Sequence, residues 1–286
     1  MVWRKRKTMK FAVFILSHKR ANRVETYSTL RNSGYTGEIY IVIDDEDPQQ
    51  SLYQERFENI LVFNKSKWIE STDTVTNDKK KSSPVYARNY IEHTAKEMGY
   101  DAYIVMDDDI INLRFRYVEN YVAKSQALKS SLDEVLEAYI NYLLTANIAT
   151  LSFATVMVYA GGVHSEADTV RLASHRYTCQ IHMRNLAFPV DWISLANNDS
   201  ISANSTAKLG YLWWALPFIV YDSPKMNTLP GGMKEVYDGV SEFRRAFMST
   251  VVSPSVCRVG CSKDRLAIKR DLKAAYPVII SGRWKK

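Results

Sequence analysis

Three consecutive carboxylates, Asp107, Asp108 and Asp109, follow a short apolar run that begins at Tyr103. The run is apolar on both faces, which is typical of a central strand in a parallel sheet covered by helices. Ligands of open α/β sheets bind at the carboxyl ends of the strands, where these acids should lie. Like charges so close together repel each other, and oxygen-only ligands suit Mg²⁺ or Mn²⁺. The pattern therefore favours a metal site over a solvated acidic turn.

A second group of acids, which includes Asp44 and Asp45, follows another apolar run. Strand-like runs and helical patterns alternate along this part of the chain, with strands at 10–17, 37–43 and 59–63 and helices at 22–33 and 48–58. Such alternation predicts an α/β fold with a mostly parallel central sheet between layers of helices. Two successive strands that both end in carboxylates form a pattern that chance would not readily supply.

Residues 64–82 are polar and end in Lys79, Lys80 and Lys81, and we predict a mobile loop that orders over a ligand. Ser83 and Pro84 then begin a helix that Gly99 ends. Arg88 lies beside the apolar stripe of this helix, from which it could reach the ligand cleft.

The second half of the chain has less regular patterns. Ser131 and Glu134 form a capping box ahead of a helix with a clear apolar stripe. The remaining expected elements are strands at 113–122, 148–158, 177–183 and 212–220, a loop at 161–174, and helices at 200–210 and 240–248.

The composition is that of a globular enzyme, with 286 residues, 46% of them hydrophobic and 24% charged. The net charge of +7 permits a polyanionic partner. No apolar stretch approaches the ~20 residues of a membrane span, and the run behind the basic N-terminus is too short for a signal peptide. Cys179, Cys257 and Cys261 are sparse, which suits a reducing cytoplasm. Cys257 and Cys261 could be half of a zinc site, but buried thiols are the preferred interpretation.

Together these features resemble the GT-A family of nucleotide-sugar glycosyltransferases. The resemblance covers residues 10–112 well and 177–220 loosely. It implies a Rossmann-like GT-A fold in one continuous domain, in which residues 1–125 bind the nucleotide-sugar and residues 126–286 bind the acceptor. It also implies a nucleoside-diphosphate sugar as donor, with a UDP-sugar favoured, and a hexosyl- or pentosyltransferase activity.

The resemblance assigns roles to the acids. Asp107, Asp108 and Asp109 match the family's D-x-D motif, so Asp109 would bind Mn²⁺ or Mg²⁺ directly. Asp107 would contact the ribose or a metal-bound water, and Asp108 would lie with it beside the donor. The other expected donor contacts are His18, Arg20, Asp44, Asp45 and Arg88.

An inverting transferase also needs a carboxylate that takes the proton of the acceptor hydroxyl. Many members of the family place it at the start of a helix in the second half of the domain. Asp199 fits that position, with a helix N-cap as its alternative role, and Asp191 is the second candidate. The family often supplies a late histidine to the metal; the last histidine here is His182, which puts that contact in doubt.

The acceptor stays open between two classes. The chain is similar to phage enzymes that glycosylate hydroxymethylated pyrimidines in DNA, and its basic charge would suit double-stranded DNA. A saccharide or small-molecule acceptor fits equally well. A nucleotidyltransferase is a further alternative, although the loop after the first strand has no glycine, and a non-catalytic nucleic-acid-binding module would not explain acids at two strand ends. A cytoplasmic enzyme is expected, in the host cytoplasm if a phage encodes it.

Overall fold

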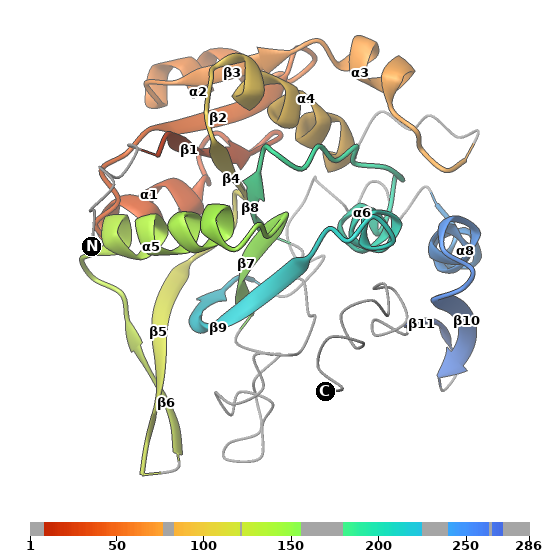
Figure 1. Cartoon of the computed structure of the whole chain (residues 1–286). Helices are drawn as coiled ribbons and strands as arrows, with labels where there is room; N and C mark the ends of the chain where they lie inside the picture. The colour runs from red at the N-terminus through yellow and green to blue at the C-terminus, as the bar shows by residue number, and fades with distance from the viewer. Residues whose placement is uncertain are drawn as a thin grey trace.

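The computed structural model of the chain describes residues 9–76, 83–120, 122–155, 180–224, 240–262 and 265–270. A large sheet runs through this part of the molecule in the strand order β3-β2-β1-β4-β8-β7-β9-β5-β6 (Figure 1). Helices pack against both of its faces, which confirms the predicted α/β fold class.

The first four strands form the parallel part of the sheet, as predicted from their continuous apolar runs. These strands are β1 (Phe11–Leu16), β2 (Ile39–Asp44), β3 (Ile60–Phe63) and β4 (Ala102–Asp107). The helices between them are α1 (Glu25–Asn32), α2 (Gln50–Arg56), α3 (Lys65–Ser71) and α4 (Pro84–Glu97). The carboxyl ends of β1, β2 and β4 therefore meet at one edge of the sheet, where the acids are.

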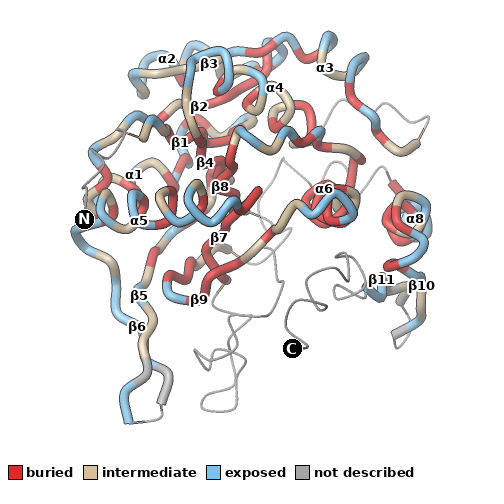
Figure 2. The backbone as a smooth tube through the Cα atoms, viewed as in Figure 1, coloured by how far each residue is buried: buried red, intermediate tan, exposed pale blue. Residues whose placement is uncertain are grey.

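Alternate side chains of β1 supply two separate cores. Val13 and Ile15 belong to the core beneath α1 and α5 (Leu132–Thr145). Phe14 and Leu16 belong to the core beneath α4 and α6 (Asn198–Ala207). Figure 2 shows β1, β4, β7 and β8 buried along the centre of the molecule, with exposed residues on the outer sides of the helices. This three-layer arrangement fixes which helices can reach the acids of β4.

The second half of the sheet is mixed rather than parallel. Its strands are β5 (Asn112–Glu119), β6 (Val122–Ala127), β7 (Thr150–Thr155), β8 (Ile181–Asn185) and β9 (Trp213–Asp222). Strand β8 runs antiparallel to β4, β7 runs parallel to β9, and β5 returns antiparallel to β9 at the far edge. The β5–β6 hairpin extends away from the body of the molecule (Figure 1).

Two sequence expectations need correction here. Residues 65–71, predicted as loop, form α3, because the Asn64 side chain accepts a hydrogen bond from the Lys67 amide at 2.8 Å and caps the helix. Lys79, Lys80, Lys81 and the expected loop at 161–174 lie outside the described residues.

The predicted capping box is also wrong, since Ser131 adopts a left-handed φ of 82° and its side chain makes no capping hydrogen bond.

The described chain ends in a small unit that was only partly predicted. Helix α8 (Glu242–Val252) packs against a hairpin of β10 (Cys257–Ser262) and β11 (Arg265–Arg270), where a basic tail without strands was expected. No described helix has both the length and the apolar character needed to cross a membrane.

Candidate functional site

The turn that carries Asp107, Asp108 and Asp109 leaves the sheet at its centre, beside the end of β1. Asp107 pairs in register with Leu16. The Thr26 hydroxyl of α1 donates to the Asp107 carbonyl at 2.6 Å and accepts from the Ile110 amide at 2.9 Å. The start of α1 therefore holds both ends of the acidic turn.

The three acids have different surroundings. Asp108 is 4% exposed, and its carboxylate accepts hydrogen bonds from Ser17 Oγ and Arg20 Nη1, each at 2.7 Å. The side chain of Asp107 is 34% exposed, and Asp109 accepts one hydrogen bond from Gln180 Nε2 at 3.2 Å. Asp108 thus fixes the loop after β1, whereas the two outer acids are accessible to a ligand.

Arg88 connects the acidic turn to the second half of the chain. It is buried on α4, its Nη2 lies 3.9 Å from Asp107 Oδ1, and its Nη1 donates to the side chain of Asn198. Its guanidinium carbon lies 4.9 Å from the centre of the Trp192 ring. The sequence placed Arg88 near the cleft, but Asn198 and Trp192 were not identified as its partners.

Asp199 follows Asn198 in the first turn of α6 and is largely buried. The capping position belongs to Asn197, which has a left-handed φ of 56°, so the N-cap alternative for Asp199 is wrong. The negative charge of Asp199 is among those that raise the pKa of Asp107. Asp199 therefore acts electrostatically on the acidic turn.

Asp191, the second candidate base, lies elsewhere. It is exposed, and it is not among the charges that act on Asp107. Its neighbour Trp192 points the other way, into the core, where its ring contacts His182 and Trp213. The structure brings Asp199, and not Asp191, to the acidic turn.

The electrostatics of the turn are unfavourable without a cation. Partial burial raises the pKa of Asp107 above its ordinary value; the positive charge of Arg88 opposes this, and the charges of Asp109, Asp108 and Asp199 add to it. Burial also raises the pKa of Asp109. Carboxylates held together in this way are suited to binding a divalent cation.

The donor set fits a metal that retains other ligands. No cluster of three or more acidic, histidine or cysteine side chains suited to a metal occurs in the described part of the chain. Two carboxylates, Asp107 and Asp109, remain, and Mg²⁺ commonly binds one or two carboxylates together with water and substrate phosphates. His182 cannot act as the late histidine ligand, because its ring is fully buried on β8, 5.0 Å from the Trp192 ring.

The loops after β1 and β2 are joined by a charged network. His18 Nδ1 lies 3.0 Å from Asp44 Oδ2 and 3.4 Å from Asp47 Oδ2, and Lys65 Nζ lies 3.2 Å from Asp44 Oδ1. Burial alone would lower the pKa of His18, but hydrogen bonds and charge from Asp44 and Asp47 raise it to about 9. His18 and Asp44 therefore stabilise each other's charged forms. The sequence pointed to both of them but not to Lys65, which lies beyond the next strand.

Asp45 is exposed and has a local role. Its carboxylate accepts hydrogen bonds from Asn64 Nδ2 at 2.9 Å and from the Lys65 amide at 3.0 Å. It therefore supports the start of α3, a segment for which the sequence predicts a loop.

The two late cysteines do not form half of a metal site. Both lie on β10, and residues four apart on a strand are separated by about 13 Å. Cys257 is buried and accepts a hydrogen bond from Asn204 Nδ2 at 3.2 Å, as expected of a buried thiol. Cys261 is exposed, so the same expectation is wrong for it.

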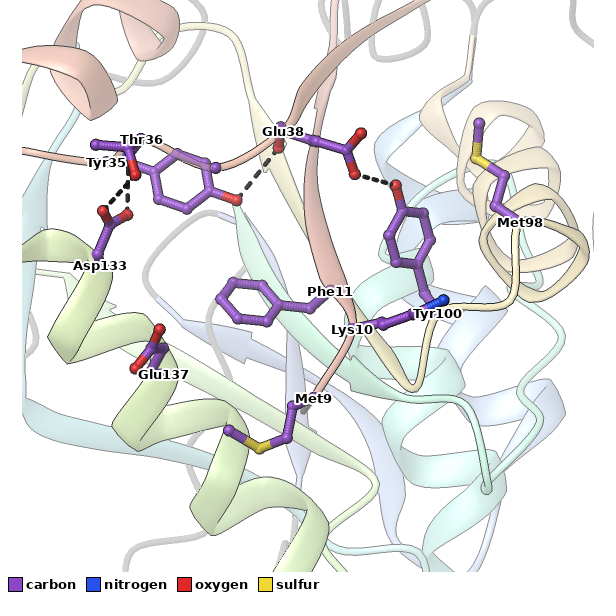
Figure 3. A pocket seen from close by; sticks show the side chains of 11 residues that line it. Met9, Lys10, Phe11, Tyr35, Thr36, Glu38, Met98, Tyr100, Asp133 and Glu137 are labelled. Atoms are coloured by element: carbon purple, nitrogen blue, oxygen red, sulfur yellow. Dashed lines mark hydrogen bonds between the residues drawn. The ribbon is translucent and has the colours of Figure 1, made fainter. Parts of the chain in front are cut away.

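A cavity of about 480 Å³ lies at the opposite, amino-terminal end of β1 and β2 (Figure 3). The polar groups around it bind one another. Tyr100 donates to Glu38 Oε2 at 2.7 Å, and Thr36 donates through its amide and hydroxyl to Asp133 at 2.9 and 2.6 Å. Because parallel sheets bind ligands at their carboxyl ends, we do not assign the reaction to this cavity.

Comparison with known proteins gives a match to one family model. Residues 11–208 match the sequence model of a family described as TAGT, TET-Associated Glycosyltransferase. No curated protein matches the chain. This matched range contains the whole parallel half of the sheet, the acidic turn and Asp199.

Two solved structures are similar in fold at very low identity. A CMP:2-keto-3-deoxy-manno-octonic acid synthetase complexed with CTP is 8% identical, and the match covers 73% of this chain and 89% of that chain with a TM-score of 0.35. A mycobacterial protein is 7% identical, with 92% of this chain and 84% of that chain covered and a TM-score of 0.43. Both matches are too loose to bear on function.

Proposed function

The chain belongs to the TET-associated glycosyltransferase family, and from that premise we propose that it moves a sugar from a nucleoside-diphosphate sugar to a hydroxymethylated pyrimidine in DNA. The proposed donor is a UDP-sugar, and the proposed metal is Mn²⁺ or Mg²⁺ at Asp107 and Asp109. Membership of a glycosyltransferase family decides against a nucleotidyltransferase and against a non-catalytic nucleic-acid-binding module.

One observation carries the proposal. The largely buried carboxylate of Asp199 acts electrostatically on Asp107 from the first turn of α6. Arg88 holds the neighbouring Asn198 and lies beside Asp107, so one residue links the two acids. A carboxylate whose charge acts on the proposed donor site is suited to accept a proton from a ligand bound there.

Asp199 would perform the proton transfer of an inverting reaction. Its carboxylate takes the proton of the acceptor's hydroxymethyl group while the hydroxymethyl oxygen attacks the anomeric carbon of the sugar. The bond between the anomeric carbon and the diphosphate oxygen breaks, and the electron pair leaves with the nucleoside diphosphate. A divalent ion bound by Asp107 and Asp109 would supply positive charge to this leaving group.

The donor's nucleoside would lie against the loops after β1 and β2, which carry His18, Arg20, Asp44 and Asp45. The ion pairs of His18 with Asp44 and of Arg20 with Asp108 keep these loops in place before the donor arrives. Preorganisation of this kind lowers the entropic cost of binding. On this proposal residues 1–125 form the donor half and residues 126–286 the acceptor half.

A base within duplex DNA must leave the helix before its hydroxymethyl oxygen can reach the sugar. A DNA acceptor would also place the reaction in the cytoplasm, or in the host cytoplasm if a phage encodes the chain.

The test is transfer of labelled sugar from UDP-, GDP- and CDP-sugars, with and without Mn²⁺, to hydroxymethylated duplex DNA, unmodified duplex and simple saccharides. We expect label on the hydroxymethylated duplex only, and only with metal. Label on saccharides alone would contradict the DNA acceptor, and label on the duplex without metal would contradict the role of Asp107 and Asp109.

A further inference from the structure

Helix α8 exposes an apolar stripe. Phe243, Phe247 and Val251 recur every four residues and are 60%, 37% and 68% exposed. Residues at this spacing share one face of a helix, and the two phenylalanine rings are 4.4 Å apart between centroids. Exposed side chains gathered in this way mark an interaction surface more often than scattered single ones do.

The hairpin that packs against α8 is strongly basic. Residues 240–270 contain seven Lys or Arg residues and two acidic residues, Glu242 and Asp264. Arg258 and Lys269 lie directly opposite each other on β10 and β11, and both are exposed. Like charges directly opposite each other destabilise a sheet. A bound polyanion would remove this cost.

Gly260 helps to place one of these cations. A Cβ at this position would lie 2.8 Å from Lys269 Cε, so the lysine stem passes directly over the glycine. The aliphatic part of Lys269 therefore lies along the hairpin, close to its backbone, instead of extending freely into solvent.

Helix α8 also contacts the segment that carries Asp199. Asn197 Nδ2 donates to the Arg245 carbonyl at 3.1 Å, and Ser194 Oγ donates to Met248 Sδ at 3.4 Å. In Figure 1, α8 stands next to α6 at the edge of the molecule. A partner bound on α8 is therefore close to the residue proposed to accept the acceptor's proton.

We propose that α8 and the β10–β11 hairpin form a nucleic-acid contact surface. Arg258 and Lys269 neutralise backbone phosphates, and Phe243 and Phe247 stack on bases unpaired where the target nucleotide leaves the duplex. Aromatic side chains beside cations are the usual means of holding unstacked bases. This inference rests on the proposed DNA acceptor, and it locates the surface that the DNA uses. Because α8 contacts Asn197, two residues before the proposed base Asp199, a DNA acceptor at Asp199 would also reach this surface. This position favours DNA over an acidic protein or a lipid surface.

The test measures DNA affinity separately from catalysis. Fluorescence anisotropy with a hydroxymethylated duplex is recorded over a range of salt for Phe243→Ala/Phe247→Ala and for Arg258→Gln/Lys269→Gln. Loss of stacking should raise Kd roughly 5- to 100-fold per base contact. Loss of two phosphate contacts should make the slope of log affinity against log salt shallower by about 1.8.

Matched controls distinguish the surface from general effects. Lys96→Ala/Met98→Ala removes an exposed lysine and an exposed apolar side chain at the carboxyl end of α4, in the proposed donor half. The Kd and the salt slope of this variant should equal those of the parent. Phe243→Leu/Phe247→Leu keeps apolar packing without aromatic rings. It should fold like the parent and still bind DNA weakly.

Transfer to a free hydroxymethylated nucleoside separates this inference from the proposed function. Surface variants should keep that transfer and donor binding while they lose transfer to the duplex. Weaker DNA binding by the surface variants, in a protein that glycosylates no DNA, would uphold the surface and refute the acceptor. Unchanged DNA affinity in both double variants would overturn the inference. So would variants that bind DNA normally but no longer bind anionic lipid vesicles.

Discussion

The Arg88 guanidinium donates a hydrogen bond to the side chain of Asn198, 110 residues further along the chain. The same guanidinium lies 3.9 Å from Asp107 and against the Trp192 ring. It therefore sets the position of the first turn of α6, and with it Asp199, relative to the acidic turn. The predictions below follow from this arrangement and from the charged networks around it.

Asp199→Asn should lower kcat by about 10²–10⁴, the usual effect of losing a general base, with little change in donor affinity. The amide retains the shape of the side chain but cannot take a proton. Steady-state kinetics and donor titration measure the two effects. Asp191→Asn is the matched control and should keep near-normal turnover. If the loss appears in Asp191→Asn and not in Asp199→Asn, the assigned base is wrong.

Asp109→Asn should abolish metal-dependent binding of a nucleoside diphosphate without loss of stability. One negative charge is removed from a group of like charges, so the melting temperature should be no lower than that of the parent. Calorimetric titration with and without Mn²⁺ measures binding. Glu97→Gln, at the exposed end of α4, removes the same charge and serves as the control, with metal-dependent binding intact. Equal Mn²⁺-dependent affinity in Asp109→Asn and the parent would remove Asp109 from the site.

Arg88→Lys should reduce kcat more than it changes donor affinity. Lysine retains the charge, but it lacks the planar group that both reaches Asn198 and stacks on Trp192. A double-mutant cycle with Asn198→Ala should give a coupling energy of about 0.5–3 kcal/mol in the activation free energy, because the two residues form one contact. Additive effects of the two substitutions would show that the contact does not position Asp199.

Stability should fall as the pH rises through about 9. Contacts with Asp44 and Asp47 raise the pKa of His18 to about 9 against the burial that would lower it, whereas an unfolded histidine titrates near 6.5. The folded state thus holds this proton more tightly. The contribution of this proton to the free energy of unfolding is complete below pH 6.5 and is lost as the pH rises from 6.5 to 9. The loss is at most about 3 kcal/mol. Urea unfolding from pH 6 to 10 measures the loss, which His18→Gln should reduce. An equal loss in this variant would contradict the prediction.

The parallel half of the sheet was predictable because its signals are local. Continuous apolar runs identified β1 to β4, and Ser83 with Pro84 marked the start of α4, where Ser83 accepts a hydrogen bond from the Val85 amide at 3.3 Å. Helix α3 was missed because its support from Asp45 comes from a different strand. The mixed second half was missed because a strand's direction depends on which neighbour it pairs with, and that choice is made by tertiary contacts.

The proposed acids could be selected from the sequence, but their partners could not. Carboxylates at a strand end can be identified from the chain alone, which selected Asp107 and Asp109, whereas Asp199 was selected by the family resemblance and by its place ahead of a predicted helix. The difference between Asp108 and its two neighbouring acids depends on Ser17 and Arg20, which donate hydrogen bonds to the Asp108 carboxylate. Such partners are distant in sequence, and nothing in the local pattern identifies them.

The position of β5 in the sheet has a consequence for how the protein is made. Asn112 of β5 pairs with Asp222 of β9, so β5 can pair with β6 at once but must wait for 110 further residues before β9 exists. Until then the β5–β6 hairpin presents an open edge that other chains can pair with. The parallel half can assemble as it leaves the ribosome, whereas the second half cannot close until synthesis is far advanced. A chaperone that covers this edge should therefore raise the yield of folded protein more than any change to the parallel half.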